Sequence, residues 1–287
     1  MQVFHDKQEL QIAISQAKLK GLKIGYVPTM GNLHAGHVEL VKLAKQRSDL
    51  VVVSIFVNPL QFGANEDLDK YPRTLEEDKQ KLISVNTDFL YCPSTEDMYP
   101  GGLSSQTLVS VPCLSDILCG ASRPGHFTGV ATVVCKLFNI VQPSTAIFGV
   151  KDFQQLAVIQ QMVTDLCIPV EIIRAPIIRA EDGLALSSRN GYLSATERLI
   201  APEIYKNLLY VKQAIVDGER NFAQLEAKAK QALVEVGMRL DYFCIRDSKT
   251  LSPGQCYHYD LVILVAAYLG NTRLIDNVTL TLLTNEV

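Results

Sequence analysis

The sequence lacks any apolar run long enough to cross a membrane. Its longest, LVILVAAYL at 261–269, is about half of what a spanning helix needs. The first residues, MQVFHDKQELQ, carry acids and no apolar centre, so they do not resemble a secretory signal. A net charge of −3 gives no overall attraction to nucleic acid or to an anionic membrane. We therefore expect a cytoplasmic protein that binds neither nucleic acid nor membrane.

Residues that form disulfides or bind metals are also scarce or badly spaced. The seven cysteines form no Cys-x-x-Cys pair and their number is odd, which favours reduced, mostly buried thiols. The closest two, Cys113 and Cys119, have neither zinc-like spacing nor a matching second pair. Only five histidines occur, so a metal site built on two of them has no nearby histidine or cysteine to complete it.

What the sequence does contain is a regular alternation of strand-like and helix-like segments up to about residue 180. The run LVVVSIFV at 50–57 is typical of a strand that is covered on both faces. Strands that alternate with helices predict an α/β fold with a parallel sheet. The predicted strands are 22–27, 50–57, 88–91, 144–149 and 169–177, and the predicted helices are 35–47, 74–85, 129–141 and 152–166.

The pattern changes after about residue 180. Two long helical stretches, 194–219 and 221–238, are followed by three short strands at 240–247, 261–269 and 272–278. Ser194 and Glu197 predict a capping box at the start of the first helix. A chain of 287 residues exceeds what one compact core usually takes. We predict two domains, 1–180 and a smaller α/β domain at 181–287, with a hinge near 181–191.

The stretch PTMGNLHAGHVEL at 28–40 is a predicted strand-to-helix turn. Such turns lie at the edge of a parallel sheet where ligands gather, and a helix N-terminus there attracts phosphate. Gly31 and Gly36 allow a ligand to approach the backbone closely. His34 and His37 are about one helical turn apart, so both imidazoles can bind the same phosphates. The two histidines could also occur together by chance or bind a metal ion. The pattern His-x-Gly-His favours nucleotidyl transfer, which is chemistry at the α-phosphate of a nucleotide.

Two further motifs place polar groups beside apolar ones. In FVNPLQF at 56–62, Asn58 and Gln61 are amides at a strand end, and Gln61 can hold both a hydroxyl and a carboxylate. In SRPGHF, Arg123 can hold an anion, whereas His126 is interpreted as structural. Plainer interpretations stay open, namely loop amides that bond to the backbone and an arginine that stabilises its own turn.

Two later segments carry cations and hydroxyls. Lys151, in FGVKDFQQL at 148–156, lies at a predicted strand end and can reach phosphates, with Gln155 one turn further on. The adjacent Asp152 also suits the capping of a helix. The loop DGLALSSRNGYLS contains Ser187–Arg189, which suits a triphosphate and can close over it. A solvated linker is the alternative, although the apolar residues at 184–186 argue against it.

Together the motifs resemble the pantothenate synthetase (pantoate–β-alanine ligase) family. The similarity runs nearly end to end, through PTMGNLHAGH, FVNPLQF, YPR, RPGHFTGVATVV, FGVKDFQQL, GLALSSRN, DYF and TRLIDN. His-x-Gly-His alone is shared with many nucleotidyltransferases and class I aminoacyl-tRNA synthetases, whereas its combination with FVNPLQF and KDFQQ is specific. The resemblance implies a Rossmann-like nucleotidyltransferase domain that binds ATP and pantoate, a smaller lid domain and a homodimer.

The resemblance also implies the reaction. ATP and (R)-pantoate give an enzyme-bound pantoyl adenylate and pyrophosphate, and β-alanine then attacks to give pantothenate and AMP, on the route to coenzyme A. Mg²⁺ accompanies the ATP. Because the adenylate has to be kept from water, we expect the 182–191 region to be open without ATP and closed over the adenylate.

Residue roles are carried over by position in these motifs. His34, His37 and Lys151 are the expected catalytic residues, with His37 as the proton donor. Gln61 and Gln155, with Asn58 and Arg123, are expected to bind pantoate or β-alanine. Asp78 is a candidate magnesium ligand, although an acid on a helix surface is more often only solvated. The expected ATP-binding residues are Met30, Gly31, Asn32, Leu33, His34, Ala35, Gly36, His37, Gly149, Val150, Lys151, Asp152, Ile178, Leu186, Ser187, Ser188 and Arg189.

Two other functions stay open from the sequence. One is a different nucleotidyltransferase that moves AMP or CMP onto a phosphate acceptor, although such an acceptor needs more cations than two glutamines supply. The other is a non-catalytic sensor that binds ATP but does not turn it over.

Overall fold

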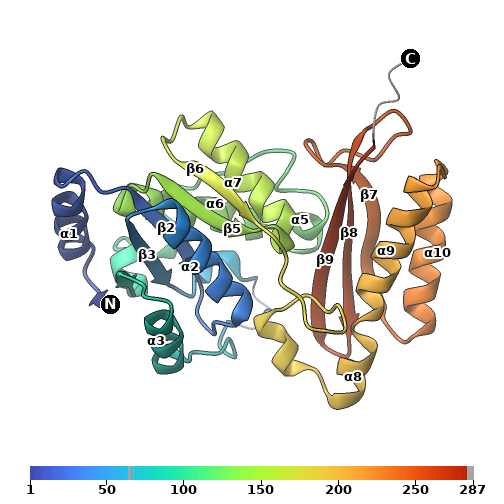
Figure 1. The fold of residues 1–287 in the computed structure, drawn as a ribbon, viewed down its shortest axis with the longest axis horizontal. Helices are drawn as coiled ribbons and strands as arrows, with labels where there is room; N and C mark the ends of the chain where they lie inside the picture. The colour runs from blue at the N-terminus through green and yellow to red at the C-terminus, as the bar shows by residue number, and fades with distance from the viewer. Residues whose placement is uncertain (64–65, 67, 283–287) are drawn as a thin grey trace. The chain divides into compact units, whose positions relative to one another are not determined.

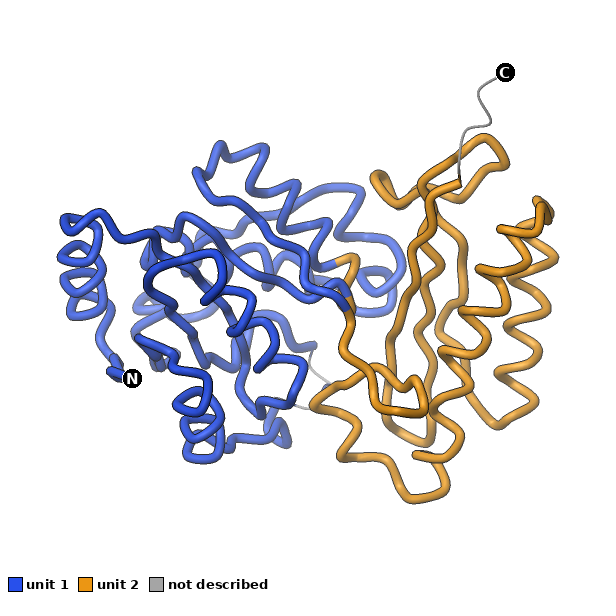
Figure 2. Tube along the Cα trace, in the orientation of Figure 1, with its two compact units in different colours: residues 1–150, 155–176 blue, residues 151–154, 177–287 orange. Residues whose placement is uncertain are grey.

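The computed structural model describes residues 1–63, 66 and 68–282, and the chain divides into two compact units (Figure 2). Unit 1 consists of Met1–Val150 and Gln155–Pro176, and unit 2 of Lys151–Gln154 and Ile177–Val287. The short stretch around Lys151 therefore belongs to a different unit from the residues on either side of it.

Unit 1 contains a six-stranded sheet in which all paired strands are parallel, so the predicted α/β class is confirmed. The strand order is β1-β4-β3-β2-β5-β6, and Figure 1 labels β3, β2, β5 and β6 of this sheet. The central strands β2 and β5 end next to each other, which brings the segments after Thr29 and Gly149 to the same edge of the sheet. The strands are β1 (Gln2–Phe4), β2 (Ile24–Thr29), β3 (Leu50–Ile55), β4 (Phe89–Tyr91), β5 (Thr145–Gly149) and β6 (Glu171–Ala175).

Helices cover both faces of this sheet. Successive strand residues point to opposite faces, so neighbouring residues of one strand pack against different helices. On one face, Val27 and Val53 pack in a cluster with Val41 of α2 and Leu82 of α3. On the other face, the ring of Tyr26 meets that of Phe138 of α6, with centroids 6.3 Å apart. The long helices are α1 (Lys7–Leu19), α2 (Ala35–Arg47), α3 (Leu75–Ser84), α6 (His126–Val141) and α7 (Phe153–Asp165).

The first two elements of unit 1 and its short helices were not predicted. Asp6 caps α1 by accepting the backbone N–H groups of Gln8 and Glu9 at 2.7 and 3.0 Å. The short α-helices are α4 (Thr95–Met98) and α5 (Cys119–Ser122), and the 3₁₀ turns are η1 (Pro59–Gln61), η2 (Leu103–Ser105) and η3 (Val150–Asp152).

Unit 2 packs helices on a three-stranded antiparallel sheet of order β7-β8-β9. Its core joins Leu208 of α9, Leu233 of α10 and Ile263 of β8, all fully buried. The elements are η4 (Ser188–Tyr192), α8 (Ala195–Ile200), α9 (Glu203–Val216), α10 (Phe222–Glu235), β7 (Arg239–Asp247), β8 (Asp260–Leu269) and β9 (Thr272–Thr281).

Two sequence predictions about these elements need correction. The single helix expected over 194–219 is two, because Pro202, which has no N–H to donate, separates α8 from α9. The cysteines were expected to be mostly buried, yet only Cys119 and Cys244 are, and Cys113, Cys167 and Cys256 are exposed. None of the seven cysteines forms a disulfide in the described residues. No helix in residues 1–63, 66 and 68–282 has the length and apolar character to cross a membrane.

Candidate active site

The turn between β2 and α2 has a left-handed backbone at two successive residues. Gly31 has φ +83° and Asn32 has φ +48°. Glycine adopts this region without strain, and asparagine tolerates it better than most residues. The turn ends at His34, which is the N-cap of α2. The predicted strand-to-helix turn is therefore present, and α2 covers the predicted helix residues 35–47.

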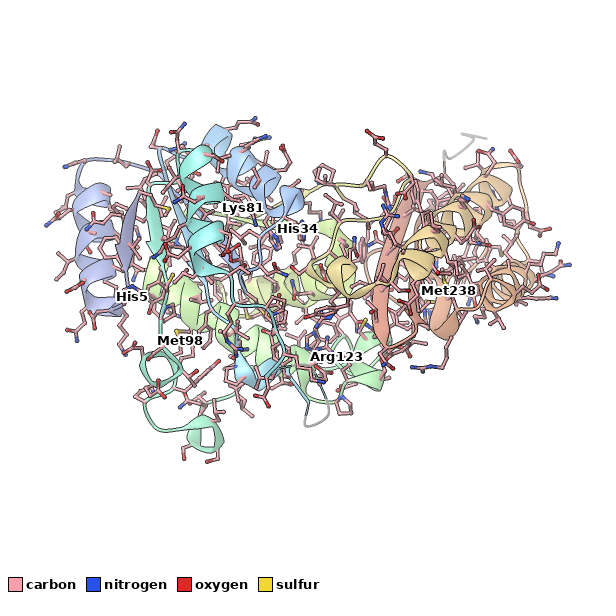
Figure 3. The ribbon with its side chains drawn as sticks, turned by 90° about the horizontal axis from the view of Figure 1, so that it is seen from below. His5, His34, Lys81, Met98, Arg123 and Met238 are labelled. Carbon is pink, nitrogen blue, oxygen red and sulfur yellow. The ribbon has the colours of Figure 1, made fainter. Side chains whose placement is uncertain are left out.

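Asp78 of α3 holds this turn through its backbone. Its Oδ1 accepts the N–H of Leu33 at 2.7 Å, and its Oδ2 accepts the N–H of Asn32 at 2.8 Å and the hydroxyl of Thr74 at 3.3 Å. Lys81, one turn further along α3, donates to the Leu33 carbonyl at 2.7 Å and lies beside the turn (Figure 3). Asp78 is fully buried, so the expectation of a solvated surface acid is wrong.

Both histidines accept backbone N–H groups at Nδ1. Gly36 donates to Nδ1 of His34 at 3.1 Å, and the N–H of His34 donates to Nδ1 of His37 at 3.3 Å. A ring nitrogen that accepts an N–H carries no proton, so each neutral ring has its proton on Nε2. The ring centroids are 4.1 Å apart. Two Nε2–H donors therefore belong to the first turn of a helix, where an anion is stabilised.

Asn58 and Gln61 form a buried amide pair with exposures of 1% and 7%. Nδ2 of Asn58 donates to Oε1 of Gln61 at 3.1 Å, and Nε2 of Gln61 lies 3.0 Å from the Met30 sulfur. The hydroxyl of Tyr99 donates to Oδ1 of Asn58 at 2.7 Å. The structure thus brings FVNPLQF against Met30, in the segment that leads into the His-x-Gly-His motif, and it fixes the orientation of both amides.

Arg123 binds protein groups next to this motif. Its Nε and Nη2 each donate to an oxygen of Glu66 at 2.6 Å, and its Nη1 lies 2.9 Å from Nε2 of His126. Nδ1 of His126 lies 2.8 Å from the Gln61 carbonyl, so a neutral ring donates there and accepts from Arg123. Burial acts to raise the pKa of Glu66, but the Arg123 guanidinium outweighs it and the pKa is lowered. These bonds favour the local interpretation of Arg123, and the contacts of His126 with Arg123 and Gln61 agree with its interpretation as structural.

Lys151 has a mostly buried side chain, 18% exposed, at the start of the 151–154 stretch of unit 2. Its Nζ lies 3.6 Å from Oδ2 of Asp152. Its carbonyl accepts a hydrogen bond at 3.0 Å from Nδ2 of Asn277 on β9. The side chain is therefore tied at its base by a residue that the sequence analysis gave no role.

The segment before Ser187 is folded back on itself, so it is not a solvated linker. The N–H of Leu186 donates to the Ile178 carbonyl at 2.9 Å. Ser187 then caps η4 by accepting the N–H of Arg189 at 3.2 Å. Ser187 and Arg189 are both half-buried. The apolar residues at 184–186 behave as the sequence predicted, since two of the three are buried.

The predicted residues therefore fall into two sets. In unit 1, hydrogen bonds link the histidine turn to Asp78, and Gln61 to Met30 and Asn58. Gly149 ends β5 next to α2, and Gln155 is half-buried at the start of α7. In unit 2, Lys151 and Asp152 lie together, and Ile178 pairs with Leu186.

Several supporting residues were missed by the sequence analysis. Gly129 of α6 lies so close to η1 that a Cβ there would overlap the Leu60 carbonyl oxygen. Tyr99, Lys81 and Asn277 each bond to a predicted site residue or its backbone. Gly129 and Asn277 lie inside motifs that carried the resemblance, which is the only signal that could have found them.

A parallel α/β sheet with a His-x-Gly-His turn at the end of β2 defines a protein of the Rossmann-like nucleotidyltransferase class. A profile of the family described as Pantoate-beta-alanine ligase matches residues 2–279. A pantothenate synthetase of Pseudomonas putida (strain W619) is 60% identical over 270 residues, 94% of each chain.

Solved structures agree with the sequence relatives. The pantothenate synthetase of Thermus thermophilus superposes with a TM-score of 0.91 at 44% identity, over 97% of this chain and 99% of that one. A pantoate–β-alanine ligase of Francisella tularensis, in complex with β,γ-ATP and β-alanine, gives 0.79 at 38% identity over 97% of both chains. The chain belongs to the pantoate–β-alanine ligase family, and it is an ATP-dependent ligase of pantothenate biosynthesis.

Proposed function

We propose that the reaction runs through a pantoyl adenylate formed at the first turn of α2. The observation that carries this proposal is the pair of Nδ1 hydrogen bonds that leave His34 and His37 as Nε2–H donors. A carboxylate oxygen of (R)-pantoate attacks the α-phosphorus of ATP, and the bond to the β-phosphate oxygen breaks to release pyrophosphate. Charge gathers on the phosphates in this step, so donors fixed beforehand stabilise it more than they stabilise bound ATP.

The nucleotide is proposed to bind at the motifs that the family resemblance assigns to ATP. His34 and His37 bond to its phosphates, with His37 as the proton donor, and Lys151 and Ser187–Arg189 neutralise the triphosphate. The remaining contacts are proposed from backbone and apolar groups, at Met30, Gly31, Asn32, Leu33, Ala35, Gly36, Gly149, Val150, Asp152, Ile178 and Leu186. The complex of the Francisella tularensis relative supports ATP and β-alanine as ligands here.

Pantoate is proposed to bind at Gln61 and Gln155. The Gln61 amide is held by Asn58, so its orientation is set before the substrate arrives and less entropy is lost on binding. We assign Arg123 a supporting role, because its guanidinium is bound to Glu66. In the second step the amine of β-alanine attacks the pantoyl carbonyl, and AMP leaves with the bridging oxygen.

Magnesium is proposed to arrive with the ATP. Mg²⁺ in phosphate sites is commonly held by phosphate oxygens, water and one or two carboxylates. Within the described residues, no three His, Cys, Asp or Glu side chains form a metal cluster. The carboxylate of Asp78 accepts three hydrogen bonds and has about four acceptor sites, so it fits one metal contact at most. When bound, the ion would neutralise phosphate charge.

At the level of the whole chain we propose that residues 1–180 bind ATP and pantoate and that 181–287 act as a lid. We also propose a homodimer, which the family resemblance implies, and a cytoplasmic location, which the N-terminal sequence and the lack of a long apolar run favour. An AMP-release assay with ATP and pantoate, with and without β-alanine, tests the function. We expect exchange of labelled pyrophosphate into ATP that requires pantoate, and AMP turnover that also requires β-alanine. Exchange that depends on a phosphorylated alcohol would favour a different nucleotidyltransferase. No exchange at all would favour a non-catalytic sensor that binds ATP.

A further inference from the structure

The base of Lys151 is held by a side chain 126 residues further along the chain. Asn277, on β9, donates Nδ2 to the Lys151 carbonyl at 3.0 Å and is itself only 2% exposed. Residues 151–154 belong to unit 2, whereas Val150 and Gln155 belong to unit 1. The hydrogen bond therefore fixes, within unit 2, the short stretch that carries the lysine.

The residue before it, Asp276, holds the segment that leads to Ser187–Arg189. Its carboxylate accepts two hydrogen bonds from the guanidinium of Arg179, at 2.6 and 2.9 Å, and is 4% exposed. Arg179 also donates to the Gly183 carbonyl at 3.0 Å and stacks on the Tyr205 ring, 3.6 Å from its centroid. The guanidinium of Arg179 binds the carboxylate in a bidentate manner and stacks on a ring, so it has little freedom to move.

The two anchors are joined to each other. The backbone N–H of Asn277 donates to Oδ1 of Asp276 at 2.7 Å, and Nη2 of Arg179 lies 3.4 Å from the Asn277 carbonyl. Burial raises the pKa of Asp276, and the Arg179 guanidinium opposes part of that rise. Because a buried charge left without its partner is costly, displacement of Asp276 from Arg179 is opposed. The two hydrogen bonds to its backbone keep Asn277 beside this ion pair.

We propose that Asp276 and Asn277 are positioning residues that hold Lys151 and the loop of Ser187–Arg189 in register for one triphosphate. This inference rests on the proposed function, in which both segments bind ATP. Neither residue needs to touch a substrate. Asn277 acts through the Lys151 backbone, and Asp276 acts through Arg179 and the folded segment 178–186.

The first test replaces Asn277 and compares ATP with β-alanine. Asn277→Asp keeps the shape but loses the donor to Lys151, and Asn277→Ser keeps a small polar group that is too short to reach. We expect the KM for ATP to rise about five- to tenfold, as for one lost hydrogen bond, while the KM for β-alanine changes less than about twofold. If Asn277→Asp does not fold, Asn277→Ser gives the same comparison.

A matched control separates positioning from general stability. Glu226 of α10 accepts the backbone N–H of Ile245 at 2.8 Å, so Glu226→Ala also removes one side-chain bond to the backbone of unit 2. We expect it to lower Tm as Asn277→Ser does and to leave the KM for ATP unchanged. Equal changes in KM for ATP in both variants would overturn the inference.

The double variant with Lys151→Ala tests whether Asn277 acts through the lysine. Lys151→Ala alone should weaken ATP use, and adding Asn277→Ser should then change the KM for ATP less than about twofold. Additive effects would refute positioning through Lys151. If Lys151→Ala alone leaves the kinetics unchanged, the proposed role of Lys151 has failed, and this result is distinct from failure of the Asn277 inference.

The loop is tested by hydrogen exchange in the Asp276→Asn variant, which weakens the hold on Arg179. We expect faster amide exchange in residues 182–189 and a KM for ATP raised by about tenfold or more, because a charged hydrogen bond is lost. Exchange at wild-type rates in that segment, in a variant that folds, would show that Asp276 does not position the loop.

Discussion

At the scale of single residues, hydrogen bonds at Nδ1 determine what the two histidines can do. Because the N–H groups of Gly36 and His34 donate to these nitrogens, both neutral rings carry their proton on Nε2. Such a ring donates to a phosphate oxygen without first being charged. This proton position agrees with the proposed role of the pair, which is to stabilise negative charge at the α-phosphate, and it does not suit removal of a proton through Nδ1.

Replacing one imidazole tests this assignment. His37→Ala should lower kcat about 10²-fold or more, because a donor placed for the transition state contributes several kcal/mol. His258→Ala is the control, since His258 also accepts a backbone N–H through Nδ1, at 3.2 Å, in unit 2. Near-normal kcat in His37→Ala, with circular dichroism of the native protein, would remove His37 from the chemistry.

Asp78 belongs to the same scale, as the acid that shapes the turn. Asp78→Asn presents an NH₂ group to backbone N–H donors of Asn32 or Leu33, so we expect about 3 kcal/mol less unfolding free energy in urea. Activity should fall with it, while the magnesium concentration for half-maximal rate stays the same. Asp97→Asn, at an exposed cap, should cost less. A variant of native stability that needs far more magnesium would make Asp78 a metal ligand and not a structural acid.

At the scale of elements, the site depends on how closely α6 approaches η1. Gly129 faces the Leu60 carbonyl, and a Cβ there would lie 2.7 Å from the Gln61 nitrogen. Gly129→Ala should cost about 1–3 kcal/mol of stability through overpacking and should raise the KM for pantoate more than that for ATP. Gly101→Ala, where the nearest atom is 3.7 Å away, is the control. Unchanged pantoate kinetics would show that the amide pair tolerates a shifted η1.

Periodicity alone predicted most of the elements but not their interruptions. The predicted helix 35–47 and strand 144–149 agree with α2 and β5 to within a residue, because apolar spacing and glycine placement mark both. The helix predicted over 194–219 ignored Pro202. The bonds that shape the site were not predictable in this way, since Asn32 and Asp78 are 46 residues apart and Asn277 and Lys151 are 126 apart.

At the scale of the whole molecule, the proposed lid makes a prediction about residues 182–191. If this region closes over the adenylate, limited proteolysis within it should slow several-fold when ATP and pantoate are both present. The turn at 247–251 of unit 2 serves as an internal reference and should be cut at the same rate throughout. Equal cleavage of 182–191 with and without substrates would contradict the proposed closure.

The central claim is that the carboxylate of pantoate is activated by direct attack on the α-phosphorus of ATP. Transfer of ¹⁸O from pantoate labelled in its carboxylate tests it most directly, by mass spectrometry of the products. The account predicts one labelled oxygen in AMP for each pantothenate formed and none in pyrophosphate. Label in inorganic phosphate or pyrophosphate, with unlabelled AMP, would mean that activation occurs at another phosphorus and would contradict the account.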